Sequence, residues 1–191
     1  MSDLSILTVP GLGNAAPGMW MSLWEAGRPD WRRVVQADWD DPDPDAWCAA
    51  IAAAVAEAQR PVVLVAHSLG ALAVARLAER EPAALAPVAG ALLVAPPDAA
   101  QTLTKPEIAR FGTGEAGGGP WTALPFPSIL AASQSDPWCA YERAAALAKA
   151  WGATLFDAGA AGHLATADGY GEWPEGEALL DDLVAAIRLG A

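Results

Sequence analysis

Ser68 lies in a five-residue pattern that is typical of an activated serine nucleophile. The segment Ala66-His-Ser-Leu-Gly70 places a small residue two positions before the serine and another two positions after it. This is the nucleophile-elbow pattern, with Ala66 where the first glycine usually stands. Apolar residues 62–66 precede it and an alanine- and leucine-rich run, 71–79, follows it. An ordinary strand–turn–helix would also fit so short a match, but these flanks predict a turn that exposes the hydroxyl above a buried strand.

A serine hydroxyl attacks an acyl carbon only when a base removes its proton, and the chain has two histidines for that role. His163 lies in a glycine-rich loop after the last predicted strand, from where it can fold back over Ser68. His67 leaves the strand on the side opposite to the serine, so we interpret it as a packing or orienting residue. Gly159 and Gly162 would also fit a simple turn, but the late histidine favours a base at His163.

An acidic side chain must orient the imidazole of the base and stabilise its charged form. Asp136 follows the fifth predicted strand, on the serine side of the sheet edge, and we predict that it fills this role. It could at the same time cap the helix that follows. Asp98, after the fourth predicted strand, is the alternative, and Asp157, inside or at the end of a strand, is less favoured. With Asp136, the order along the chain is serine, aspartate, histidine, as in α/β-hydrolases.

Acyl transfer also needs hydrogen-bond donors for the negative charge that develops on the carbonyl oxygen. The backbone N–H of Leu69, directly after the nucleophile, is one candidate. The loop after the first predicted strand should supply the other, and we predict the N–H of Leu12. Gly11 and Gly13 in this loop would also be explained by a simple turn. We expect Gly11 and Trp138 to contact the substrate.

Six short segments predict the strands that must position these groups: residues 5–9, 33–36, 62–66, 90–94, 128–132 and 154–157. Helical segments alternate with them, and no linker or repeat interrupts the chain. We therefore predict one three-layer α/β domain over residues 1–191, with a mainly parallel sheet and helices on both faces. The strand order 2-1-3-4-5-6 would bring the Gly11 loop and Ser68 to one crevice at the switch point.

Apolar residues at helical spacing predict the helices. Trp20, Leu23 and Trp24 mark one face of a short helix after the first strand. A longer helix begins at the Asp43-Pro44 cap and should face the core with residues 47, 51, 55 and 58. The last helix is predicted to begin near Pro174.

Residues 99–125 are the least regular stretch, with Gly117-Gly-Gly-Pro120 in the middle. They are the only candidate cover for the crevice, and they are too few and too rich in glycine and proline for a helical lid domain. We therefore predict a minimal cap or none. Trp138 and Trp121 are positioned to line the crevice, although core packing would account better for either one alone. We predict a shallow, partly apolar site that favours short acyl chains over long lipid chains.

The composition excludes several classes of partner. The net charge is −12 with 11 lysines and arginines, so we expect no nucleic acid and no membrane surface as a partner. Cys48 and Cys139 have no metal-ligand spacing and suggest no disulfide framework, so we expect no metal and no cofactor. The N-terminus has no signal-peptide pattern. A cytoplasmic location is the expectation that follows.

Together these motifs resemble the small α/β-hydrolase-fold serine hydrolases related to retinoblastoma-binding protein nine and the YdeN-like proteins. The resemblance covers nearly the whole chain, in order: Val9-Pro-Gly-Leu-Gly13 with Trp20 and Trp24, Ala66-His-Ser-Leu-Gly70, Ser135-Asp-Pro137, Gly162-His163 and Trp173-Pro-Glu-Gly176. It implies that Ser68, Asp136 and His163 form a catalytic triad on a compact fold with little or no cap.

One property of that family should not be carried over. Its retinoblastoma-protein binding is attributed to a Leu-x-Cys-x-Glu segment. Neither Cys48 nor Cys139 has a leucine two residues before it and a glutamate two residues after it. We therefore expect no partner of the retinoblastoma type.

Two classes of function remain open on the sequence. The first is a serine hydrolase that cleaves a small-molecule ester, thioester or amide, with an acyltransferase as a variant that differs only in its acceptor. The second is a non-catalytic binding protein that retains the hydrolase fold. An intact set of serine, acid and base favours the enzyme.

Overall fold

One six-stranded parallel sheet forms the centre of the computed structural model, which describes residues 3–100, 105–112 and 122–190. The strand order is β2-β1-β3-β4-β5-β6, as predicted, and every neighbouring pair is parallel. The strands are β1 (Ser5–Val9), β2 (Arg32–Arg33), β3 (Val62–His67), β4 (Val88–Val94), β5 (Ser128–Ala132) and β6 (Thr154–Asp157).

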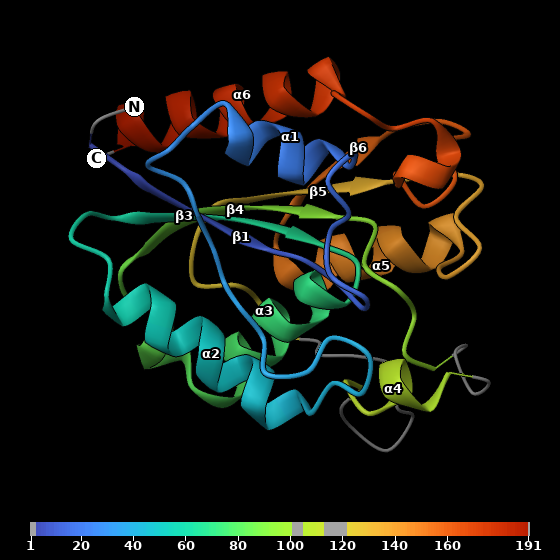
Figure 1. The fold of residues 1–191 in the computed structure, drawn as a ribbon, viewed down its shortest axis with the longest axis horizontal. Helices are drawn as coiled ribbons and strands as arrows, with labels where there is room; N and C mark the ends of the chain where they lie inside the picture. The colour runs from blue at the N-terminus through green and yellow to red at the C-terminus, as the bar shows by residue number, and fades with distance from the viewer. Residues whose placement is uncertain (1–2, 101–104, 113–121, 191) are drawn as a thin grey trace.

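Helices cover both faces of the sheet and complete the predicted three layers (Figure 1). On one face lie α1 (Trp20–Ala26) and α6 (Pro174–Gly190). On the other lie α2 (Pro44–Ala56), α3 (Leu69–Arg80) and α5 (Tyr141–Trp151). The shorter helices are α4 (Pro106–Ala109), η1 (Pro82–Leu85) and η2 (Thr166–Asp168). In these described residues, no helix is both long and apolar enough to cross a membrane.

The central strand β3 divides its side chains between two cores. Val62, Leu64 and Ala66 face the core beneath α2, α3 and α5, where the packing is mostly aliphatic. Val63 and Val65 face the core beneath α1 and α6, where several tryptophans gather. Successive side chains of a strand point to opposite faces, so a strand buried on both faces is apolar throughout. This burial is what allows β3 to hold the turn at its end rigidly.

The second strand is shorter and begins earlier than the predicted segment 33–36. Only Arg32 and Arg33 pair with β1, after which the Val34 N–H donates one more bond to the Thr8 carbonyl at 2.9 Å. Val35 is then 71% exposed. The alternation of burial continues past the end of the ladder, and for this reason the sequence pattern overextends the strand.

Three further element predictions differ in detail. Leu23 is 37% exposed, so the buried stripe of α1 is formed by Trp20, Met21 and Trp24. Helix α2 ends at Ala56, two residues before the position predicted to face the core. Helix α3 begins at Leu69, directly after Ser68, rather than at residue 71.

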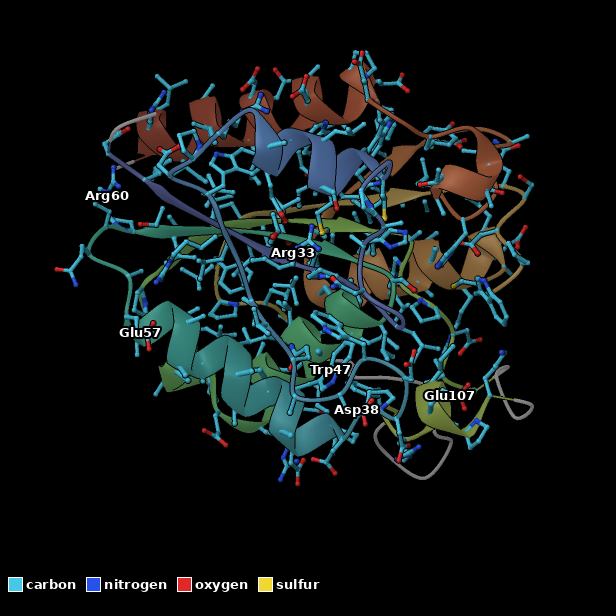
Figure 2. All side chains as sticks on the ribbon, viewed as in Figure 1. Arg33, Asp38, Trp47, Glu57, Arg60 and Glu107 are labelled. Atoms are coloured by element: carbon cyan, nitrogen blue, oxygen red, sulfur yellow. The ribbon has the colours of Figure 1, made fainter. Side chains whose placement is uncertain are left out.

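Part of the predicted irregular stretch, residues 105–112, is a short helical segment docked on the core. Ile108 of α4 is 5% exposed, and Phe111 is fully buried with its ring centroid 5.5 Å from that of Trp47. Figure 2 shows Trp47 at the end of α2 that lies towards α4, and Glu107 on α4 itself. With four residues in α4, the expectation of a minimal cap is confirmed for the described residues. Trp121 lies outside them.

Candidate active site

Ser68 occupies a strained backbone turn between β3 and α3. Its φ of 53° and ψ of −124° lie in a region that residues other than glycine rarely adopt. Such a conformation costs on the order of 1–3 kcal/mol and persists only where the surroundings impose it. The Ser68 N–H donates to the Val94 carbonyl at 2.8 Å, and its carbonyl accepts from the Ala71 N–H at 3.0 Å. The turn is thus anchored on β4 and on the first turn of α3.

The small residues of this region are required by close backbone approach. A Cβ on Gly70 would lie 2.2 Å from the Val9 carbonyl oxygen, so the end of β1 passes directly over the start of α3. A Cβ on Gly11 would lie 2.8 Å from the Ser68 Cβ. The loop after β1 is therefore pressed against the serine turn. Gly11 thus packs directly against the serine turn, and its predicted contact with the substrate stays a prediction.

The side chains of Ser68, His163 and Asp136 form an unbroken line of contacts. The His163 Nε2 lies 2.9 Å from the Ser68 Oγ, and its Nδ1 lies 3.0 Å from both carboxylate oxygens of Asp136. A carboxylate only accepts, so Nδ1 carries the proton and donates it to Asp136. The lone pair of Nε2 is then directed at the serine hydroxyl. This is the tautomer that a base for Ser68 needs.

His67 lies beside His163, with the ring centroids 4.9 Å apart, and binds the backbone of that histidine rather than the serine. Its Nε2 lies 3.0 Å from the His163 carbonyl, and its ring meets the Trp20 ring edge-on at 5.9 Å. A carbonyl only accepts, so His67 Nε2 carries a proton and donates it. Burial, together with the neighbouring His163, lowers the pKa of His67 from 6.5 to about 3. His67 therefore stays neutral and has the orienting position that the sequence suggested.

Side chains outside the predicted set hold the loop that carries His163. Asp168 accepts the His163 N–H at 2.9 Å, and the Trp20 indole donates to the Leu164 carbonyl at 2.9 Å. Gly162, with a φ of 57°, lies so close to Asp168 that a Cβ there would approach the carboxylate oxygen within 2.1 Å. Sequence reasoning missed Asp168, because its role depends on a turn whose shape follows from this contact.

Two serines join the loop of the acid to the loop of the base. Ser133 Oγ accepts the Ala161 N–H at 2.9 Å, and Ser135 Oγ accepts the Gly162 N–H at 2.9 Å. Ser135 immediately precedes Asp136 in the chain, and Ser133 lies three residues before it. Their position beside the predicted acid was visible in the sequence, but not the partners they select. The spacing between acid and base is therefore set by backbone amides as well as by the triad contacts.

The two alternative acids have other partners. Asp98 is 3% exposed, and its Oδ1 accepts the Ala100 N–H at 2.9 Å and lies 3.4 Å from the Arg143 Nε. Asp157 is exposed and accepts hydrogen bonds from the Gly159 N–H and the Gln134 amide, both at 2.8 Å. These bonds lower the pKa of Asp157. Neither arrangement leaves the carboxylate aligned with an imidazole in the way Asp136 is.

Asp136 does not cap the following helix, although its position in the sequence would have allowed it to do so. Its Oδ1 accepts the Trp138 N–H at 2.9 Å and so closes a short turn. Helix α5 begins at Tyr141, with Ala140 at its cap position. The short turn aims the carboxylate at His163 and brings the Trp138 ring towards the site.

The predicted oxyanion donors lie on two segments that approach each other closely at Gly11. Leu69 is the first residue of α3, and a Cβ on Gly11 would lie 3.1 Å from the Leu69 nitrogen. Leu12 follows in the same loop. In the described chain, neither the Leu12 N–H nor the Leu69 N–H donates to a backbone carbonyl. The first amides of a helix have no partner inside it and carry a partial positive charge.

An arginine on β2 holds the loop that carries Leu12. Arg33 donates to the Asn14 Oδ1 at 3.0 Å and to the Ala15 carbonyl at 3.2 Å. Its other side forms an ion pair with Glu25 of α1 at 2.7 Å. Figure 2 shows Arg33 beside the sheet, between α1 and α2. This contact, which has no motif in the sequence, orients the loop in which Asn14 adopts a φ of 66°.

A cleft of about 170 Å³ opens at the serine. It is lined by Leu12, Ser68, Lys105, Ile108, Trp138 and His163. Trp138 lies where the sequence predicted it. Lys105 and Ile108 were not predicted, because they lie in a stretch without a regular pattern, whose position depends on the burial of Ile108 and Phe111 in the core. A larger hollow of about 280 Å³ lies between β2 and α2, and neither serine nor histidine lines it.

The two cysteines do not compete with Ser68 as nucleophiles. Both are buried and unpaired. Burial raises the pKa of Cys48 to about 11 and that of Cys139 to about 12. A thiol reacts as the thiolate, so both stay unreactive near neutral pH.

Comparison with known proteins places this geometry in context. A family model described as "Serine hydrolase" matches residues 6–182. A YdeN-like hydrolase from Pectobacterium atrosepticum is 31% identical, with a TM-score of 0.83 over 97% of this chain and 93% of that one. No curated protein matches the sequence.

More distant solved structures share the fold. The ydeN gene product of Bacillus subtilis is 19% identical, with a TM-score of 0.73 over 95% of this chain and 98% of that one. Est1E from Butyrivibrio proteoclasticus, solved with ferulic acid, is 13% identical, with a TM-score of 0.61 over 94% and 86%. At these identities the likeness concerns the α/β-hydrolase fold alone.

Proposed function

Because this chain belongs to the serine hydrolase family, we propose that it cleaves a small ester, thioester or amide through an acyl-serine at Ser68. His163 acts as the general base and Asp136 orients it. The observation that best supports this assignment is the line of contacts from the Ser68 Oγ to His163 at 2.9 Å and from His163 to Asp136 at 3.0 Å.

In the first half-reaction, His163 Nε2 takes the proton of Ser68 as the Oγ attacks the carbonyl carbon. The carbonyl electrons move to the oxygen, which becomes an oxyanion. His163 is now charged on both nitrogens, and Asp136 stabilises that imidazolium without accepting its proton. The tetrahedral species collapses, His163 gives its proton to the departing alcohol, thiol or amine, and an acyl-serine remains.

The oxyanion of this half-reaction needs fixed donors. The N–H groups of Leu12 and Leu69 are the proposed pair, since they lie on two segments that approach each other closely at Gly11. One such donor typically contributes about 10²–10³ in rate, because it requires no reorganisation when the charge develops. Arg33 contributes indirectly by holding the loop that carries Leu12.

In the second half-reaction, water replaces the leaving group. His163 removes a proton from the water, whose oxygen attacks the acyl carbon. A second tetrahedral species forms and collapses, the proton returns to the Ser68 oxygen, and a carboxylic acid leaves. An acceptor other than water would make the same chain an acyltransferase, so the nature of the acceptor distinguishes the two activities.

The cleft favours short acyl groups. Its volume is about 170 Å³, and its apolar lining consists of Leu12, Ile108 and Trp138. Among the described residues, little further apolar wall is available to bury additional methylenes, each of which would otherwise contribute about 0.8 kcal/mol. We therefore expect acetate to butyrate esters to be better substrates than long-chain esters.

The experiment that tests this function is covalent labelling with a fluorophosphonate probe, followed by hydrolysis of short p-nitrophenyl esters. Ser68→Ala should abolish labelling and lower ester turnover by at least about 10³-fold. Ser5→Ala is the matched control, because Ser5 lies at the opposite end of the parallel sheet, where it pairs with Val62. A Ser68→Ala protein that hydrolyses esters at the wild-type rate would refute the nucleophile.

A non-catalytic binding protein remains the alternative outcome of this experiment. Wild-type protein that neither labels nor hydrolyses any ester of the series would favour it. The cytoplasmic location and the absence of nucleic-acid, metal and cofactor partners, expected from composition, stay predictions.

A further inference from the structure

Lys105 contributes a positive charge to a cleft that is otherwise apolar or catalytic. It lines the cleft together with Leu12, Ile108 and Trp138. Its Nζ lies 5.6 Å from the centroid of the Trp138 ring. An ammonium over an indole face is stabilised by the ring, and the contact holds a flexible side chain in one place. The ammonium group therefore lies at the wall of the cleft.

This charge is exceptional in the molecule. The chain has a net charge of −12, and Lys105 is one of its two lysines. Arginines near the site are paired, Arg33 with Glu25 at 2.7 Å and Arg143 with Asp98 at 3.4 Å. In the described chain, Lys105 forms no ion pair. Its partner in the tertiary structure is an aromatic ring rather than a carboxylate.

The buried carboxylates behind the cleft are already engaged. Asp136 contacts His163 through both oxygens, and Asp98 faces Arg143. Glu107, two residues after Lys105, lies on α4 (Figure 2) and is not among the residues that line the cleft. A strongly acidic protein repels anionic ligands in general, so a single cation at the reaction cleft changes the local preference.

Building on the proposed function, we propose that Lys105 selects substrates that carry a carboxylate close to the scissile carbonyl. The size of the cleft limits the separation to a short chain, as in the monoester of a four-carbon dicarboxylic acid. One ammonium balances one carboxylate. A phosphate carries more charge and is usually bound by several donors or by a bidentate arginine, and the cleft has no arginine among its lining residues.

The interaction should act mainly on discrimination between substrates. A charge-assisted hydrogen bond from Lys105 stabilises the bound carboxylate, whereas a neutral isostere of the same length receives only apolar contact from Leu12, Ile108 and Trp138. We expect a preference of about tenfold in kcat/KM for the charged substrate, because the contact is partly exposed to water.

The test compares the hydrolysis of monoethyl succinate with that of ethyl butyrate, measured as proton release in a pH-stat. The acyl group of monoethyl succinate ends in a carboxylate, and that of ethyl butyrate ends in a methyl group. The ratio of kcat/KM for the charged over the neutral ester is measured for wild type, Lys105→Met and Lys149→Met. Met keeps the length and apolar stem of lysine. Lys149 is the matched control, since it lies exposed on α5.

Lys105→Met should lower that ratio about tenfold, and Lys149→Met should keep the wild-type ratio. A second pair, acetoxyacetate and propyl acetate, places the carboxylate on the leaving group. A drop confined to one pair identifies the side of the scissile bond that faces Lys105. An equal ratio in wild type and Lys105→Met for both pairs would overturn the inference.

The same set of ester assays, repeated with Ser68→Ala, separates this inference from the proposed function. Ser68→Ala must remove hydrolysis of all four esters if the serine is the nucleophile. Hydrolysis that depends on Ser68 with no effect of Lys105→Met on either ratio refutes only the carboxylate preference. Hydrolysis that persists in Ser68→Ala refutes the proposed function itself.

Discussion

The carboxyl ends of β4 and β5 each carry a buried aspartate, and the two regions use it differently. At the end of β5, Asp136 turns both carboxylate oxygens to the Nδ1 of His163 at 3.0 Å. At the end of β4, Asp98 faces the guanidinium of Arg143 and the N–H of Ala100. The two side chains are equally buried, with 4% of Asp98 and 3% of Asp136 exposed, so burial does not distinguish a catalytic carboxylate from a structural one. The group that each carboxylate faces does.

The difference follows from what each loop must hold. The β5 loop meets the His163 loop through Ser133 and Ser135 and so fixes an imidazole. The β4 loop instead positions the cleft wall, because the Asp98 N–H donates to the Trp138 carbonyl at 2.9 Å. One region therefore serves the reacting groups, and the other serves the surface around the substrate.

Replacing the two aspartates should have the largest and most unequal effect. Asp136→Asn keeps the shape but leaves an amide opposite Nδ1, which favours the wrong imidazole tautomer and should lower kcat about 10³–10⁴-fold. Asp98→Asn weakens the pair with Arg143 and should lower the free energy of unfolding by about 1–3 kcal/mol, with kcat within about tenfold of wild type. Ester kinetics and urea unfolding of both variants measure this.

One result would contradict this comparison. If Asp98→Asn lowers kcat more than Asp136→Asn, while both proteins unfold cooperatively, the acid that orients His163 lies at the end of β4. The roles assigned to Asp98 and Asp136 would then be wrong.

A smaller effect is expected at Asp168, which extends the comparison to an aspartate that acts through the backbone. Asp168→Ala removes the acceptor for the His163 N–H and should lower kcat about 10- to 100-fold with little change in KM. Asp168→Asn, which keeps an acceptor oxygen, should recover much of the loss. An Ala variant with normal kcat and raised KM would place Asp168 in substrate binding.

The smallest effect on turnover is expected at His67, whose contribution lies in the pH dependence of stability. Its pKa of about 3 in the folded protein lies below the ordinary value of 6.5. The unfolded chain therefore takes up a proton below pH 6.5 that the native protein does not, and His67 lowers the free energy of unfolding as the pH falls from 6.5 towards 3. Above pH 6.5 it has no such effect.

His67→Gln keeps a donor for the His163 carbonyl but removes this titration. The difference in unfolding free energy, wild type minus variant, should become more negative by up to about 1.4 kcal/mol per pH unit below pH 6.5. Urea unfolding at pH 7, 6 and 5 measures it. Parallel pH profiles would mean that the pKa of His67 is the same in the folded and the unfolded protein, and would contradict the lowered value.

Sequence predicted the centre of the sheet well because its four central strands are buried on both faces. A segment such as residues 62–66 must be apolar throughout, and this separates it from the helices. The carboxyl ends of parallel strands share one edge, so residues that follow different strands could be assigned to one crevice. Ser68, Asp136 and His163 were selected in this way, from residue type and order, and the structure brings them together.

The supporting contacts could not be predicted in the same way. Asp168 and Arg33 bind backbone groups in loops with positive φ, and no spacing in the sequence marks such partners. Lys105 reaches the cleft because Phe111 packs on Trp47, a contact between segments far apart in the chain. The end of β2 was misjudged because burial alternates beyond the last ladder pair.

The most direct test of the account is the mass of the enzyme during turnover. Wild-type protein is mixed with p-nitrophenyl acetate, quenched in acid within milliseconds to seconds and digested for mass spectrometry. A good leaving group makes acylation fast, so the acyl-enzyme accumulates before water releases it. We predict one acetyl group on the peptide that contains Ser68, and none in Ser68→Ala. Steady hydrolysis with Ser68 unmodified, or with the acetyl group on another residue, would contradict the account.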